Sequence, residues 1–155
     1  MVVIEWKIKK FHALTTTEWY KIAKLRSDVF IVEQACVYDE FDQRDQPSLH
    51  LFLEDDGEIL SYSRLMPGGV MYKEASISRV IVSENHRGEG YAGQLLQQAV
   101  DYVSQVMKES AIKIQAEQYL TDFYRRFGFR VISEPYLDCG ISHVDMLREE
   151  ETDDL

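Results

Sequence analysis

The segment from Ser78 to Gly93 constrains the fold of this 155-residue chain more than any other part. Val80 to Val82 is an apolar, β-branched run, which is typical of a buried strand. A turn with glycines at positions 88, 90 and 93 follows, and Arg87 stands at its head. Apolar residues then recur at helical spacing from Leu95 to Val106. The segment therefore predicts a strand, a glycine turn and a helix in succession.

The turn has the features of an anion site. Glycines leave backbone N–H groups open to a ligand, because they carry no side chain that would block the approach. The start of the helix adds unpaired N–H groups and the positive end of its dipole. Arg87 adds a planar fork of donors. The ligand that these features predict is a pyrophosphate, held by Arg87, Gly88, Gly90, Tyr91, Ala92 and Gly93.

Two nucleotide-binding motifs compete with this interpretation. The P-loop is excluded, since no Gly-Lys-Ser/Thr follows the glycines. The dinucleotide motif Gly-x-Gly-x-x-Gly does fit Gly88, Gly90 and Gly93 by spacing. That motif normally opens a doubly wound domain, whereas here it lies past the midpoint with one further strand–helix pair behind it. The glycine pattern alone leaves two alternatives. The chain is a nucleotide-binding protein of another kind, or the glycines only allow the turn between strand and helix and bind nothing.

The rest of the chain predicts a single α/β domain. Helices are expected from the capping box Thr15-x-x-Glu18 to residues 31–34, over 91–108 and over 121–127, with an irregular acidic loop at 35–48. Strands are expected at 2–9, 49–54, 58–65, 76–82, 111–116, 129–133 and 141–147. This order predicts a mixed, mostly antiparallel sheet in one layer with helices on both faces, over residues 1–148. Residues 149–155 form an acidic tail that we expect to be disordered.

Composition narrows the partners and the compartment. A net charge of −10 argues against nucleic acid and favours cationic partners. The chain has no apolar run long enough for a bilayer, and its first residues lack the pattern of a signal peptide, so we expect no membrane association. The two cysteines, Cys36 and Cys139, have no metal-ligand spacing, so we expect no metal site. Reduced thiols in a cytoplasmic protein are the simple expectation. The oligomeric state is left open, with a homodimer as one alternative.

The motif Arg87-x-x-Gly90-x-Ala92 resembles the phosphate-binding signature of the GNAT N-acetyltransferases. Phe123-Tyr124-x-x-x-Gly128-Phe129 resembles a second element of that family. Two further stretches, Leu25 to Gln34 and Asp138-x-Gly140-Ile141-x-His143, resemble the ElaA-type branch. The resemblance implies an acyl-CoA N-acyltransferase fold, acetyl-CoA as cofactor, and direct transfer of an acetyl group to a primary amine of a small molecule or peptide.

The resemblance also implies roles for individual residues. The backbone of Val80, Ile81 and Val82 would contact the pantetheine arm, although their side chains also suit a core. Tyr124 would protonate the leaving thiolate; its alternative is an aromatic that only packs. Glu117 stands where many relatives carry asparagine and is a candidate base.

Other assignments stay open on the sequence alone. Further candidate bases are Glu33, His50 and His143. A bound water is another candidate, and charged residues such as these are equally well explained by salt bridges. Cys36 as an acyl-accepting nucleophile has no support, so a packed thiol is expected. The carboxylates of residues 39–45 are expected to attract a cationic acceptor. A CoA-binding sensor without catalysis is the alternative function.

Overall fold

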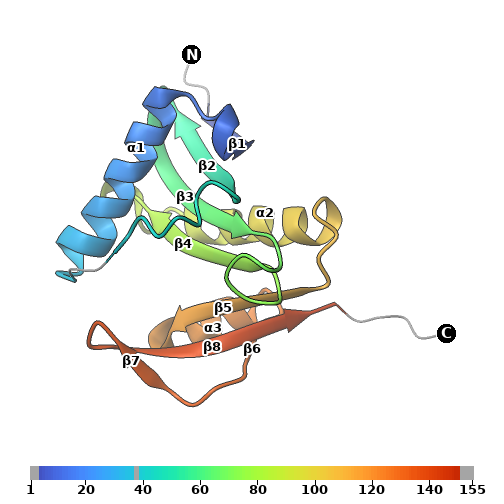
Figure 1. Cartoon of the computed structure of the whole chain (residues 1–155). Coiled ribbons are helices and arrows are strands. Elements are labelled where there is room, and N and C mark those ends of the chain that lie inside the picture. The colour runs from blue at the N-terminus through green and yellow to red at the C-terminus, as the bar shows by residue number, and fades with distance from the viewer. Residues whose placement is uncertain (1–3, 37–38, 151–155) are drawn as a thin grey trace.

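The structure is a computed structural model that describes residues 4–36 and 39–150. Its strands form two antiparallel sheets (Figure 1). The first contains β1 (Ile4–Lys10), β2 (Leu49–Asp55), β3 (Glu58–Met66) and β4 (Ser76–Val82), in that order. The second is built on β8 (Ile141–Glu149), which pairs with β5 (Ala111–Glu117), β6 (Arg130–Val131) and β7 (Tyr136–Asp138).

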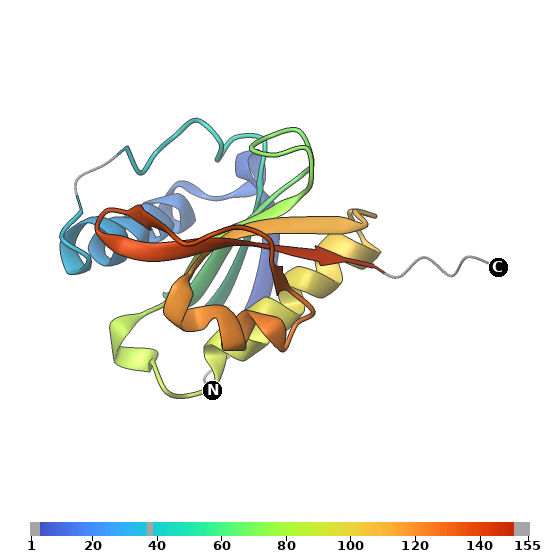
Figure 2. The same cartoon turned by 90° about the horizontal axis from the view of Figure 1, so that it is seen from below.

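Helices lie on both faces of the sheets. Figure 2 shows α1 (Thr16–Arg26) on one side of the strands and α2 (Tyr91–Gln105) and α3 (Thr121–Arg125) on the other. The π-helix η2 (Ser27–Glu33) directly continues α1. Short 3₁₀ turns complete the helical elements: η1 (Phe11–Ala13), η3 (Glu84–His86) and η4 (Gln118–Leu120). Within the described residues, no helix is long and apolar enough to cross a membrane.

The alternation of side chains along β2 explains this arrangement. Leu51 is buried in the larger apolar cluster, together with Leu95 and Leu96 of α2. Its neighbour Phe52 is buried in a second cluster, with Ile22 of α1. Successive residues of a strand point to opposite faces, so one buried strand packs against helices on each side. The predicted helices on both faces are confirmed.

The sheet is divided in the middle, unlike the one-layer sheet that we expected. Residues at the edges of β4 and β5 meet in a parallel bridge between Ala75 and Ile112, where the Lys113 N–H donates to the Ala75 carbonyl at 2.8 Å. Beyond this bridge β4 and β5 are not paired in the described structure. Neighbouring parallel strands that are paired only at one end leave their backbones exposed to each other at the other end. A pocket opens there.

Local differences from the sequence prediction have physical reasons. The helix predicted from Thr15 is correct at its start, where Thr15 and Glu18 form the expected capping box, with bonds of 2.8 and 3.0 Å. It changes to a π-helix at Ser27.

The three-residue strand β7 was not predicted because so short a segment has no readable alternation. The first residue of the predicted tail, Glu149, is ordered in β8 and pairs with Arg130 at 2.6 Å. Residues 151–155 of that tail lie outside the described residues.

Candidate active site

A pocket of about 640 Å³ lies between the two sheets. Its walls include β4 of the first sheet, β5 and the β7–β8 hairpin of the second, and the end of η2, together with residues of η4 and α3. The pocket reaches Arg87 at the head of the glycine turn. The structure thus brings Arg87 of the predicted anion site, Glu117 and Tyr124 to one cavity.

A β-bulge shapes the β4 wall of this pocket. Tyr62 of β3 pairs with Ile81, and Arg64 pairs with Ser78, so the single residue between them opposes both Arg79 and Val80. Arg79 has a φ of 54°, a left-handed conformation that is uncommon for residues other than glycine. A bulge interrupts the regular ladder and bends the strand that carries the extra residue. Val80, Ile81 and Val82 all line the pocket, while the Ile81 side chain is buried among apolar residues of α1 and β2.

The glycine turn has the conformation of an anion cradle. Gly88 and Gly90 have φ values of 81° and 84°. A Cβ atom added at Gly88, Gly90 or Gly93 would meet no described atom within 4 Å, so the surface of the turn is open. Among the described side chains, none caps the start of α2 at Tyr91. The first N–H groups of a 15-residue helix are therefore available to an anion. These features fit a pyrophosphate.

Arg87 makes an ion pair that the sequence did not predict. Its two terminal nitrogens lie 2.6 and 2.8 Å from the carboxylate oxygens of Glu33, and its Nε donates to the Val82 carbonyl at 3.1 Å. The hydrogen bonds from Arg87 lower the pKa of Glu33. A carboxylate with a lowered pKa is a weaker proton acceptor, so the structure favours an ion-pair role for Glu33 over that of a base. The pair also joins η2 to the head of the glycine turn.

Tyr124 is buried on α3 and lines the pocket. Its ring makes edge contacts with Phe123 and Phe129, at centroid distances of 5.3 and 6.0 Å. Burial raises the pKa of the Tyr124 hydroxyl well above its usual value, and the charge of Glu117 adds to the shift. The group therefore keeps its proton at neutral pH, which a general acid requires. The ring packs and the hydroxyl is protonated, so the two interpretations of this residue are compatible.

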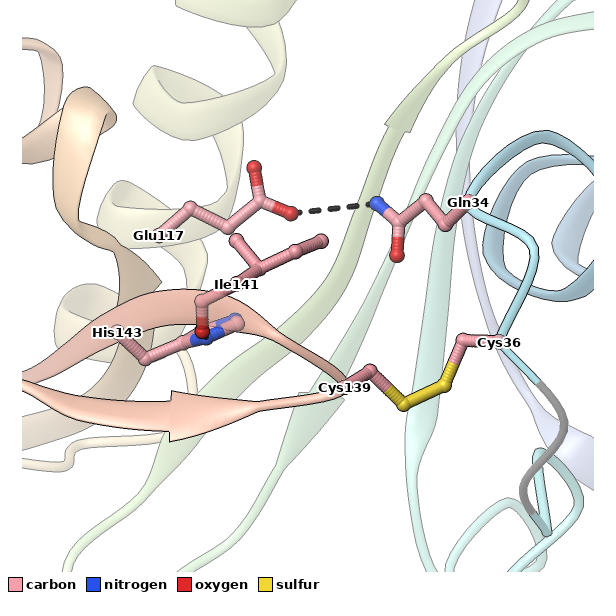
Figure 3. Close-up of a disulfide and its surroundings, with 6 residues drawn as sticks. All are labelled: Gln34, Cys36, Glu117, Cys139, Ile141 and His143. Carbon is pink, nitrogen blue, oxygen red and sulfur yellow. Dashed lines mark hydrogen bonds between the residues drawn. A yellow bond between two sulfur atoms is a disulfide. The ribbon is translucent and has the colours of Figure 1, made fainter.

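Glu117 ends β5 and is held from two sides. Gln34 donates a hydrogen bond to its carboxylate at 3.2 Å, from the end of η2 (Figure 3). A hydrogen bond to Glu117 also raises the pKa of the Tyr119 hydroxyl to about 12, although the Tyr119 side chain is 76 % exposed. The sequence did not reveal these two contacts: Gln34 ends a stretch that resembles the ElaA-type branch, but that resemblance implied no role for it, and Tyr119 belongs to no recognisable motif. Both orient the carboxylate toward the pocket that it lines.

Glu117 also belongs to a row of three side chains across the second sheet. In the register, His143 of β8 lies opposite Glu117 on one side and opposite Tyr136 of β7 on the other. Residues directly opposite in antiparallel strands point to the same face. The His143 ring stacks on Tyr136 with an interplanar angle of 21°. Its Nδ1 lies 2.8 Å from the Ile141 carbonyl, which only accepts, so Nδ1 carries the proton in a neutral ring and Nε2 has the lone pair.

The acidic loop contains buried ion pairs. Glu40 and Asp45 lie 2.6 Å from nitrogens of the buried Arg26, and Asp42 lies 2.8 Å from Arg64. Burial alone would raise the pKa of Asp42, but hydrogen bonds from Arg64 and its charge hold that pKa well below its usual value. Fewer carboxylates of this loop are therefore open to a cationic acceptor than the number of acidic residues in its sequence indicates.

His50 lies in the same buried network. Its Nδ1 accepts from the Tyr62 hydroxyl at 2.7 Å, and its Nε2 donates to the Asp45 carbonyl at 2.9 Å. Burial lowers the pKa of this ring. Since both nitrogens are occupied and His50 does not line the pocket, the structure gives it a packing role. In the described part of the chain, no group of three or more histidine, cysteine or acidic residues could hold a metal ion.

The expectation of separate reduced thiols is wrong for this structure. Cys36 and Cys139 form a disulfide, with their Cα atoms 6.0 Å apart (Figure 3). The two residues are 103 positions apart in sequence, and only the folding of the β7–β8 hairpin toward the end of η2 brings them together. No spacing rule could have revealed this approach.

Comparison with known proteins agrees with the fold. The family profile of acetyltransferase (GNAT) domains matches residues 20–150. A UPF0039 protein of Schizosaccharomyces pombe is 36 % identical over 148 residues, which cover 94 % of this chain and 97 % of the relative. The chain therefore belongs to the GNAT acetyltransferase family, whose fold supports acyl transfer and binds acyl-CoA.

Two crystal structures specify the branch. An acyl-CoA N-acyltransferase from Pseudomonas aeruginosa superposes with a TM-score of 0.90 at 33 % identity, over 94 % of this chain and 99 % of that one. Escherichia coli ElaA superposes with a TM-score of 0.89 at 31 % identity, over 95 % of this chain and all of ElaA. The ElaA-like resemblance noted from the sequence is confirmed.

Proposed function

We propose that this chain transfers an acetyl group from acetyl-CoA to a primary amine on a small molecule or peptide. The observation that carries the proposal is the continuity of one pocket from Arg87, at the head of the open glycine turn, along the bulged strand β4, to Tyr124 and Glu117. When bound, acetyl-CoA would supply the activated acetyl thioester. The turn from Arg87 to Gly93 would hold its pyrophosphate, and the backbone of Val80, Ile81 and Val82, which line the pocket, would contact its pantetheine arm.

The side chains of the pocket suit the proton transfers of this reaction. Tyr124 holds a proton on its hydroxyl oxygen at neutral pH, and would give it to the departing thiolate sulfur. The Glu117 carboxylate would take the proton from the attacking amine. The lone pair on Nε2 of His143, in the same row, is a second acceptor for that proton. Backbone N–H groups of β4 would stabilise negative charge on the carbonyl oxygen.

A cationic acceptor is supported by the charges on the second-sheet side of the pocket. Glu117 and Asp138 line this side, whereas the two lining arginines already pair with carboxylates: Arg79 with Glu40 at 2.8 Å, and Arg87 with Glu33. A negative site concentrates a cationic substrate, and the effect weakens with added salt. The acceptor kcat/KM should therefore fall as ionic strength rises.

Calorimetry with CoA and a screen of amines and peptides with acetyl-CoA test this proposal. Thiol release above the rate without acceptor is the expected result. CoA binding without thiol release over a broad panel would instead support a sensor. That second function has one structural argument: Arg87 can use its terminal nitrogens on a phosphate only if Glu33 moves away, which couples η2 to cofactor binding. Absence of CoA binding would refute both functions.

A further inference from the structure

The Cys36–Cys139 disulfide lies in the wall of the pocket. Cys36 follows η2, and Cys139 lies in the turn between β7 and β8. Both cysteines line the pocket, and in Figure 3 the yellow bond connects the two chain segments beside the Gln34–Glu117 hydrogen bond. The disulfide thus joins two pocket walls that belong to different halves of the chain.

The turn of the hairpin places Cys139 at the tip. Cys139 and Gly140 have φ values of 52° and 74°, and the flanking Asp138 and Ile141 pair with each other. Two consecutive left-handed residues are the signature of a tight type I′ hairpin turn. The direction of the Cys139 side chain is therefore fixed by local backbone structure. Ile141 and His143 follow directly on β8, so any movement of the tip is transmitted to residues that line the pocket.

The two cysteine residues differ in exposure. Cys36 is buried, with 6 % of its surface exposed, whereas Cys139 is an exposed residue. An incoming thiolate reaches a disulfide by attack along the bond on the more accessible sulfur. Here that sulfur is Sγ of Cys139, and the buried Cys36 is the leaving thiolate.

We propose that Cys36–Cys139 is a thiol-exchange site, opened by small thiols, that controls how firmly the β7–β8 hairpin is attached to the end of η2. In the first step a small thiolate forms a bond to Sγ of Cys139, and the Cys36–Cys139 bond breaks with release of the Cys36 thiolate. A second small thiolate then attacks the sulfur of the bound thiol and releases Cys139. The protein gains two electrons and two protons, and two molecules of the small thiol are oxidised to their disulfide.

After reduction, weaker contacts connect η2 to the second sheet. The Gln34–Glu117 hydrogen bond, at 3.2 Å, still links η2 to the second sheet, but it can break without a chemical step. Strand β7 is paired with β8 in this structure, so the hairpin should persist while its tip moves more freely. As a control of acceptor access, this inference rests on the proposed function; the exchange step itself does not.

Glutathione and dithiothreitol are the probes for the test. The oxidised protein, once denatured, should show no free thiol. After reduction with dithiothreitol and removal of the reagent it should show two free thiols per chain, since the chain has two cysteines. Peptide mass spectrometry after brief glutathione treatment should find the adduct on Cys139. Amide hydrogen exchange of residues 136–143 should become several-fold faster on reduction, while the amides of β2 stay unchanged. Cys139→Ser should show the fast exchange with and without dithiothreitol.

The outcomes separate this inference from the proposed function. An adduct on Cys36, no adduct at all, or equal exchange of the hairpin in both states would overturn the thiol-exchange site. Calorimetry with CoA on the oxidised and the reduced form tests the proposed function separately from the exchange step. If CoA binds neither form while the exchange results hold, the proposed function fails and the redox site stands.

Discussion

Gly90→Val tests the cofactor site most directly, because the structure supplies a matched control. Gly90 has a φ of 84°, and an added Cβ would meet no described atom within 4 Å. Gly69 has a φ of 94° and the same open surroundings, but it lies outside the glycine turn. A side chain in this conformation costs about 1–3 kcal/mol of stability at either position. Gly90→Val and Gly69→Val should therefore lower the melting temperature similarly.

Only the change at Gly90 should weaken CoA binding. A branched side chain there would lie where backbone must approach the phosphate, and each hydrogen bond lost to a charged group is worth about 1.5–3 kcal/mol. One lost bond corresponds to a roughly 10- to 150-fold higher Kd. Calorimetry with CoA on both variants measures this difference. Affinities for Gly90→Val and Gly69→Val that agree within twofold would refute the assignment of the turn as the cofactor site.

Four further changes test the rest of the site. Tyr124→Phe should lower kcat by about 10²–10⁴-fold with little change in CoA affinity or melting temperature; full activity, with chemistry limiting turnover, would leave water as the proton donor. Glu117→Gln preserves the size of the side chain and should reduce kcat/KM because it removes the proton acceptor; an unchanged kcat/KM, with chemistry limiting turnover, points to Nε2 of His143 as the proton acceptor. Glu33→Gln should free Arg87 from an exposed ion pair worth about 0.2–1 kcal/mol, so CoA should bind up to about fivefold more tightly in calorimetry, and weaker binding would contradict the competition. Asp42→Asn concerns stability: the folded pKa of Asp42 is lowered, so its contribution is complete above the unfolded value of about 3.9 and is lost as pH falls. Wild type should therefore lose more unfolding free energy than Asp42→Asn between pH 6 and pH 3, and parallel losses in denaturant titrations would show that Asp42 is not responsible.

The parts of the site that local patterns encode were predictable. Strand β4 has the predicted bounds, and the glycine turn leads into α2 as expected. Both follow from short-range rules, since glycine spacing and apolar periodicity act within a few residues of each other. The same rules gave Thr15 as the start of α1.

The missed features depend on residues far apart in sequence. The Arg87–Glu33 pair spans 54 positions, the Gln34–Glu117 bond 83 and the disulfide 103. The bulge at Arg79 is also invisible in the sequence, because an inserted residue changes pairing with the neighbouring strand and leaves the apolar run intact. Such features arise from the assembled fold, so a single sequence contains no local signal for them.

The acidic loop shows how one of these long-range features supports the site. Arg79 adopts a left-handed backbone conformation in the pocket wall, and strain of this kind persists only where surrounding contacts fix it. Its Nε donates to Glu40 at 2.8 Å, and Glu40 also binds the buried Arg26 at 2.6 Å. Its guanidinium lies over the ring of Phe30 of η2, 5.7 Å from the centroid. The loop therefore stabilises the bulge in β4. Buried carboxylates beside the pocket thus serve its wall, whereas Glu117 and Asp138 line the pocket itself.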